Sequence, residues 1–284
     1  MTPRVSPTAS RKPAASNDPW RWSIVGRTLV VAFPEPWLVL GWAPLGGGFK
    51  RADLIINHQI EMGDFAATGA PRKHLISVIG SLRCGSAFTI EDVANGAGPR
   101  SGASTAVGMM TGAQVARAGH TTLRRDGLAV GAWCTAGCSN ALRVGDRATA
   151  GVPRARDAKC PQTRPNAPGT INIIVTISQP LTRSAMAEAL QIAVEARVAA
   201  VSEAAVTSTQ SGGIATGTGT DCIVVAAPVA AQSDRANTII YCGKHTLPGE
   251  LIGRAVMRSS ATAIVRANPS NPVDDPPPRQ PDSN

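Results

Sequence analysis

Aromatic residues are scarce in this chain. Trp, Phe and Tyr together make up 4% of its 284 residues, so few side chains are available to stack on nucleic acid bases. The formal net charge of +9 and the pI near 9.9 are typical of nucleic-acid-binding proteins, but the basic residues are scattered and form no run. We therefore expect no nucleic acid partner. A basic nucleic-acid-associated protein stays a competing hypothesis, which steeply salt-sensitive binding would support.

Long apolar runs are also missing. No segment approaches the roughly 18 consecutive apolar residues that a membrane helix needs, and the N-terminus lacks the apolar core of a signal peptide. We expect a cytoplasmic protein with no membrane partner. Of the six cysteines, only Cys134 and Cys138 are close in sequence. Because no nearby spacing supplies two further ligands, we expect reduced thiols and no metal site.

Proline is concentrated at the two ends of the chain. Ten of the 22 prolines lie in the first 19 or the last 16 residues. We predict disordered tails at 1–19 and 268–284 around a single domain at 20–267. The basic, Pro-rich segment 151–168 has no periodicity and is interpreted as a surface loop of that domain. The sequence leaves the oligomeric state open.

Hydrophobic patterning predicts strands and helices in alternation. In the first half, strands are expected at 27–33, 37–42, 54–60, 75–79 and 128–135. Pro34 and Pro36 separate the first two and indicate a hairpin or a sharp corner, while the small residues at 105–118 predict a helix packed in the core.

The second half of the chain has clearer periodicity. Isoleucine and valine alternate on one face of a strand at 171–177, which places Asn172 and Thr176 on the other face. A helix follows Thr182, strands are expected at 222–227 and 238–242, and a last helix carries Pro248 and Glu250 in its first turn. These elements predict a single α/β or α+β domain with a mixed sheet and interleaved helices.

Two loops carry candidate catalytic residues. Gly217 and Gly219 begin like a dinucleotide fingerprint, but position 222 is Cys and a strand follows, so we exclude a Rossmann site. The loop delivers Asp221 to a strand end, either as a functional carboxylate or as the cap of a tight turn. His245 precedes a helix, where it is either a proton donor or a surface histidine.

Four ordered blocks of the second half match a known family. They are Gly-Thr-Ile-Asn-Ile-Ile at 169–174, Glu-Ala-Arg at 195–197, Ala-Thr-Gly-Thr-Gly-Thr-Asp at 215–221, and Gly-Lys-His-Thr at 243–246 with Gly-Glu-Leu-Ile-Gly-Arg-Ala-Val at 249–256. Shorter matches occur at 107–111 and 135–146. With these motifs, the sequence resembles the adenosylcobinamide amidohydrolases of corrinoid salvage over about residues 46–258.

The resemblance implies hydrolysis of the amide that links a propionyl side chain of the corrin ring to aminopropanol, yielding adenosylcobyric acid. The corrinoid, with its cobalt, would be the substrate, and no cofactor is expected. A non-catalytic corrinoid-binding protein is the alternative. From residue type and motif position, we expect Asp221 as the base, His245 as the acid, and Asn172 with N–H groups of the loop 217–219 as oxyanion donors.

Further substrate contacts are expected from hydroxyl and carboxylate side chains in the same motifs: Thr170, Thr218, Thr220, Glu195 and Glu250. The two glutamates also fit a solvated helix face and a helix-dipole partner, respectively. Some amide hydrolases cleave themselves before a threonine such as Thr170, which frees an α-amine as base. Because a Gly-Thr pair is common at ordinary loop-to-strand junctions, where the threonine hydroxyl caps a turn, we predict an uncleaved chain.

Overall fold

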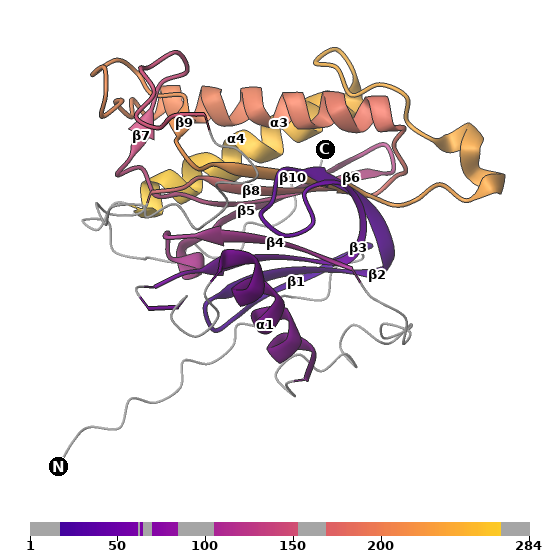
Figure 1. The fold of residues 1–284 in the computed structure, drawn as a ribbon. Coiled ribbons are helices and arrows are strands. Elements are labelled where there is room, and N and C mark those ends of the chain that lie inside the picture. Colours follow the sequence, from indigo (N-terminus) through magenta and orange to yellow (C-terminus); the bar gives the residue numbers. More distant parts are fainter. Residues whose placement is uncertain (1–17, 62, 65–69, 85–104, 153–168, 268–284) are drawn as a thin grey trace.

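The computed structural model describes residues 18–61, 63–64, 70–84, 105–152 and 169–267 (Figure 1). Most of the predicted tails and all but two residues of the predicted loop at 151–168 lie outside these ranges. The strands are β1 Arg21–Val25, β2 Thr28–Gly41, β3 Gly48–Gln59, β4 Ala106–Thr111, β5 Gly119–Arg125, β6 Leu128–Thr135, β7 Ala141–Leu142, β8 Asn172–Ile177, β9 Gly217–Thr218 and β10 Cys222–Ala227. The α-helices are α1 Pro71–Cys84, α3 Arg183–Glu203 and α4 Leu247–Ala267.

One large mixed sheet forms the centre of the fold. Its strands follow the order β4-β3-β2-β10-β8-β6-β5, and β1 pairs with β2. The pairs β8–β10 and β3–β4 are parallel, and the other pairs of this sheet are antiparallel. This arrangement agrees with the mixed α/β domain that the sequence predicts.

The sheet folds over on itself, which gives four layers (Figure 1). Helices α3 and α4 cover β5, β6, β8 and β10, and α1 covers the outer face of β2 and β3. Alternating side chains separate the layers: Ile173 and Val175 of β8 face the two long helices, while Ile174 joins an inner core between the two halves of the sheet. β8 is buried on both faces, and the four residues between and after Asn172 and Thr176 are all Ile or Val.

Among the residues that the structure describes, most aromatic side chains gather in this inner core. Trp20 meets Trp37 and Trp133 edge to face, with ring centroids 6.2 and 6.3 Å apart. Phe33 stacks on Trp37 at 4.3 Å. Trp20 is 2% exposed, so this core includes a residue that precedes β1. Aromatic pairs of this kind stabilise a core beyond the effect of their buried area.

The segment around Pro34 and Pro36 is a corner within one long strand. β2 pairs with β3 on both sides of these prolines, and the register shifts between Ala32 and Trp37. The hairpin alternative is therefore wrong. The irregularity bends the β2–β3 ribbon, so that β2 pairs with β1 before the corner and with β10 after it.

Three predicted elements are wrong. The segment 75–79 lies in α1, because Leu75 and Ile79 are buried one helical turn apart while Ile76 is 54% exposed. The segment 105–118 forms β4 and a 3-10 turn; its small Gly108 lets Leu75 approach the strand. The segment 238–242 forms a single bridge to Leu181 and no strand.

The predicted helix after Thr182 is confirmed as α3. The Thr182 hydroxyl caps it by accepting a hydrogen bond from the Ala185 N–H at 3.1 Å. Among the described helices, none combines the length and the apolar character that crossing a membrane requires.

Candidate active site

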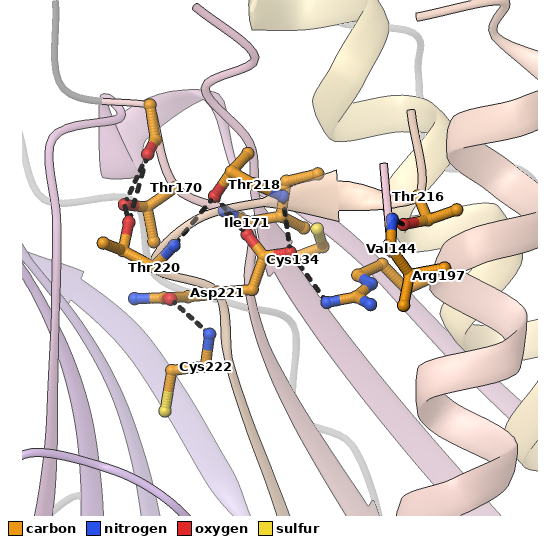
Figure 2. Close-up of polar contacts among 12 residues, drawn as sticks. Cys134, Val144, Thr170, Ile171, Arg197, Thr216, Thr218, Thr220, Asp221 and Cys222 are labelled. Atoms are coloured by element: carbon orange, nitrogen blue, oxygen red, sulfur yellow. Dashed lines mark hydrogen bonds and ion pairs between the residues drawn. The ribbon is translucent and has the colours of Figure 1, made fainter. Parts of the chain in front are cut away.

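Asp221 lies just before β10, at the end of the sheet where the parallel strands β8 and β10 begin. Its carboxylate accepts hydrogen bonds from Arg197 Nη1 at 2.7 Å and from the Ile171 N–H at 2.9 Å (Figure 2). Thr218 donates twice, through its N–H at 2.8 Å and its hydroxyl at 2.5 Å. The Asp221 side chain is only 5% exposed and that of Arg197 13%. Asp221 therefore joins α3, β8 and β9 through a largely buried ion pair.

Glycine is required next to this carboxylate. A Cβ on Gly217 would lie 2.2 Å from Asp221 Oδ2 and 3.0 Å from Arg197 Cζ. No side chain fits that space, so the Gly-Thr-Gly loop admits the ion pair by leaving room for it. This gives a physical reason for the glycine-rich motif that does not involve phosphate binding.

Two threonine hydroxyls meet beside the first residues of β8. Thr170 Oγ1 lies 2.7 Å from Thr220 Oγ1 (Figure 2). Both hydroxyls also lie within hydrogen-bond distance of the Gly169 carbonyl, at 2.8 and 3.3 Å, so one of them donates to this carbonyl while the other donates to its hydroxyl partner. A Cβ on Gly169 would lie 2.2 Å from Asn140 Oδ1, so this turn is tightly enclosed. Thr220 is exposed, and the hydroxyl pair is therefore within reach of a ligand.

Asn172 belongs to a buried network that connects the two halves of the sheet. Its Nδ2 donates to Asn57 Oδ1 at 2.9 Å and to the Met110 carbonyl at 2.7 Å, and its Oδ1 accepts from the Cys222 N–H at 3.1 Å. Asn57 Nδ2 in turn donates to Thr135 Oγ1 at 2.9 Å. Both N–H bonds of the Asn172 amide are thus engaged within the protein, which leaves neither for a substrate oxyanion.

The thiols near this network are not activated. Burial raises the pKa of Cys134 and of Cys222 to about 12, and it also raises the pKa of Cys138. A thiol with a raised pKa carries almost no thiolate at neutral pH. Among the described cysteines near the site, none is suited to be a nucleophile, so the polar chemistry rests on hydroxyl and carboxylate groups.

Trp42 is a neighbour of the site that the sequence analysis did not identify. Its Nε1 donates to the Asp221 carbonyl at 2.7 Å, and the side chain is 47% exposed. The buried residues Trp37, Val39 and Gly41 alternate along β2. Trp42 directly follows Gly41, so the same alternation points its side chain away from the core. This pattern in the sequence could have predicted its exposed position.

Glu250 and His245 lie at the other end of the sheet. Glu250 accepts two hydrogen bonds from Arg125, at 3.0 and 2.6 Å. Arg125 ends β5, whereas Gly119 begins it and pairs with Cys134 at the end that carries Asn172. At about 3.3 Å per residue, β5 separates these two ends by on the order of 20 Å. His245 is exposed and precedes the first turn of α4, which contains Glu250.

Glu195 is also separate from the Asp221 cluster. Its carboxylate pairs with Lys244 Nζ at 2.5 Å and accepts a hydrogen bond from Gln191 at 3.0 Å. The hydrogen bond from Lys244 lowers the pKa of Glu195, and that from Arg125 lowers the pKa of Glu250. The structure thus brings together a first group of predicted site residues and leaves a second apart. The first comprises Thr170, Asn172, Thr218, Thr220 and Asp221, and the second Glu195, His245 and Glu250.

Fold and site together define a four-layer α/β protein with a hydroxyl-rich polar cluster where its central parallel strands begin. The chain belongs to the adenosylcobinamide amidohydrolase family, whose model matches residues 21–272. An uncharacterized protein of Methanocaldococcus jannaschii, MJ1613, is 40% identical over 99 residues, which are 34% of this chain and 36% of that protein. The match thus spans about a third of this curated relative.

Three solved structures have a similar overall arrangement. The Burkholderia sp. beta-aminopeptidase is 15% identical, with a TM-score of 0.41 over 89% of this chain and 81% of its own. The L-aminopeptidase D-Ala-esterase/amidase of Ochrobactrum anthropi, a variant of the Ntn hydrolase fold, is 11% identical, with a TM-score of 0.40 over 88% and 78%. The PH0078 protein of Pyrococcus horikoshii OT3 is 13% identical, with a TM-score of 0.38 over 85% and 77%.

Proposed function

We propose that this protein hydrolyses the aminopropanol amide of adenosylcobinamide and releases adenosylcobyric acid, as a step of corrinoid salvage in the cytoplasm. Membership of the family supports the substrate. The observation that carries the proposal is the cluster of three threonine hydroxyls and Asp221 beside an exposed tryptophan. The corrinoid and its cobalt are the substrate of this reaction.

The proposed attack on the amide uses a water molecule and the pair of Thr218 and Asp221. Thr218 donates its hydroxyl proton to Asp221 at 2.5 Å, and its oxygen accepts the Thr220 N–H at 3.5 Å, which leaves one lone pair free to accept a proton from water. As the water oxygen bonds to the carbonyl carbon, one water proton passes to Thr218, and the Thr218 proton passes to Asp221. When the C–N bond breaks, a proton returns along the same path to the aminopropanol nitrogen.

The proposed oxyanion donors are the hydroxyls of Thr170 and Thr220. In the free protein both oxygens lie within hydrogen-bond distance of the Gly169 carbonyl and of each other, so the two donors are already held side by side. A substrate carbonyl next to the exposed Thr220 would take one of these hydrogen bonds as negative charge develops on it. Preorganised donors of this kind stabilise the transition state more than the ground state.

Trp42 is the proposed contact for the flat corrin ring. Its indole is 47% exposed, and its N–H is fixed on the Asp221 carbonyl, so an aromatic face is held beside the reacting groups. A large, mostly apolar macrocycle gains from such a rigid surface. This arrangement places ring binding and amide chemistry next to each other.

The proposal is tested by incubating the protein with adenosylcobinamide and separating the products by chromatography. We expect adenosylcobyric acid to form. The variant Trp42→Ala should raise KM with a smaller change in kcat, because it removes binding that is common to ground and transition states. Tyr241→Ala is the matched control, since Tyr241 is an aromatic residue with 60% exposure outside the cluster. Binding of the corrinoid without turnover would favour the non-catalytic alternative, and equal effects of the two variants would refute the role of Trp42.

A further inference from the structure

A second polar cluster lies on the outer face of β3, away from the candidate active site. It consists of His58 of β3, Asp64 in the segment after β3, and His74 of α1. One ligand atom from each residue lies within 4.8 Å of the other two. Asn57 and His58 are consecutive on the strand, so they point to opposite faces, and the cluster is separated from the Asn172 network by the sheet itself.

His58 is held in a form that suits a metal ligand. The residue is 6% exposed, its Nδ1 lies 2.9 Å from the Thr28 hydroxyl, and its Nε2 is buried without a hydrogen-bond partner. If Nδ1–H donates to Thr28, the lone pair of Nε2 points into the cluster.

The Asp64 carboxylate is fixed in place by its neighbours. Arg27 donates to both of its oxygens, at 3.0 and 3.1 Å, and the Glu61 N–H donates to Oδ2 at 2.7 Å. Oδ1 accepts only one of these hydrogen bonds, so its second lone pair stays available for a cation. The Glu61 carboxylate lies 3.3 Å from Arg27, so two acidic groups offset one guanidinium and the local charge favours a cation.

Two imidazoles and one carboxylate are the protein ligands of many zinc sites, in which water takes the fourth position. Calcium and magnesium prefer oxygen ligands, so the two histidines favour a transition metal. Bond lengths of about 2.0–2.2 Å place tetrahedral ligand atoms roughly 3.4 Å apart, which small side-chain rotations would reach from the present positions.

We propose that His58, Asp64 and His74 bind a divalent transition metal ion, for which Zn²⁺ is the best match. The ion would join α1 and the segment after β3 to the strand itself, as a structural clamp behind the active-site face. The Thr28 hydroxyl, which orients His58, would act as a positioning group. From the sequence we expected no metal site, because no further ligands lie near Cys134 and Cys138; that expectation did not consider residues 58, 64 and 74, which follow no recognised spacing.

The experiment uses the full chain after treatment with EDTA and dialysis. Titration with Zn²⁺ is followed by calorimetry, and titration with Co²⁺ by the visible absorption of its tetrahedral complexes. We expect one ion per chain and a rise of the thermal midpoint on binding. The variants His58→Gln and His74→Gln should lose this binding, and Thr28→Val should weaken it by about 10–100-fold.

His120→Gln is the matched control and should bind the metal as the wild type does. If His58→Gln fails to fold, the His74→Gln and Thr28→Val variants still decide the question, because they leave His58 in the core. Absence of stoichiometric binding to the wild type would overturn the proposal. Equal affinity of the wild type and His74→Gln would overturn it as well. These readouts do not depend on amide hydrolysis, so the proposed function can fail without affecting them.

Discussion

Replacing Asp221 by Asn should destabilise the protein as well as lower its activity. From the sequence alone, we would expect this isosteric change to leave the fold intact. In the structure, the carboxylate accepts four hydrogen bonds, one of them from Arg197, whose side chain is 13% exposed. An asparagine would present an N–H₂ group to some of these donors. It would also leave the guanidinium buried and unpaired, and its Nε already lacks a partner.

The size of this effect follows from the burial of the pair. Removing one partner of a buried ion pair costs about 3–5 kcal/mol, because the other charge stays desolvated. Folded domains are stable by only about 5–15 kcal/mol, so Asp221→Asn should remain folded but unfold at a clearly lower urea concentration. Loss of activity in this variant must therefore be measured where the fraction of folded protein is known.

A double-mutant cycle with Arg197→Met separates the ion pair from the other contacts. Each single variant leaves one charge of the ion pair without its partner, whereas the double variant removes both charges. We expect the double variant to be more stable than the sum of the two single losses predicts, by about 1–3 kcal/mol. The assay is the free energy of unfolding from urea titration of all four proteins. Additivity within about 0.5 kcal/mol would refute the view that Asp221 and Arg197 act as a pair.

The remaining predictions concern the pH dependence, the packing and the integrity of the chain. Burial lowers the pKa of His58 from 6.5 to about 4, so between these pH values the unfolded state binds the proton and the native state does not. Stability should therefore fall by up to about 3 kcal/mol as the pH drops from 7 to 4 in EDTA, and His58→Gln should flatten this dependence in urea titrations. Gly119→Ala should lower the thermal midpoint because its Cβ would lie 2.0 Å from a carbonyl of α4, whereas Gly253→Ala, with nothing closer than 3.8 Å, should raise it; similar shifts would contradict the close packing of β5 on α4. Denaturing mass spectrometry should find a single species of 29.2 kDa. Two fragments that meet between Gly169 and Thr170 would instead indicate that the nucleophile is the Thr170 hydroxyl and not water.

Sequence patterns predict the second half of the fold better than the first. β10 is a continuous apolar strand and β8 is rich in Ile and Val, while α3 and α4 are long helices with clear starts, so local patterning and capping are enough to find them. In the first half, α1 mixes polar and apolar residues and β4 contains small ones, so neither has a clear periodicity. Each is stabilised by packing against the other. Gly108 of β4 is small because Leu75 of α1 packs against it, which is a tertiary contact that no local pattern reveals.

The candidate site can likewise be predicted only in part from the sequence. Glycine and threonine motifs point to Asp221 and to the threonines around it, because these residues are close in sequence or begin adjacent strands. The partners Arg197 and Trp42 come from a helix and from the end of a distant strand. His245 has a suggestive local context, but its position is set by α4, which carries it to the opposite end of the sheet. Only the fold determines which of these side chains meet.

The most direct test of the proposed hydrolysis is the reaction of adenosylcobinamide in ¹⁸O-labelled water. Mass spectrometry follows the corrinoid, and a separate assay measures free aminopropanol. Hydrolysis predicts adenosylcobyric acid with one ¹⁸O atom in its new carboxylate and one equivalent of aminopropanol for each product molecule. Recovery of unchanged, unlabelled adenosylcobinamide from protein that binds it would contradict the hydrolysis and leave a corrinoid-binding protein in its place.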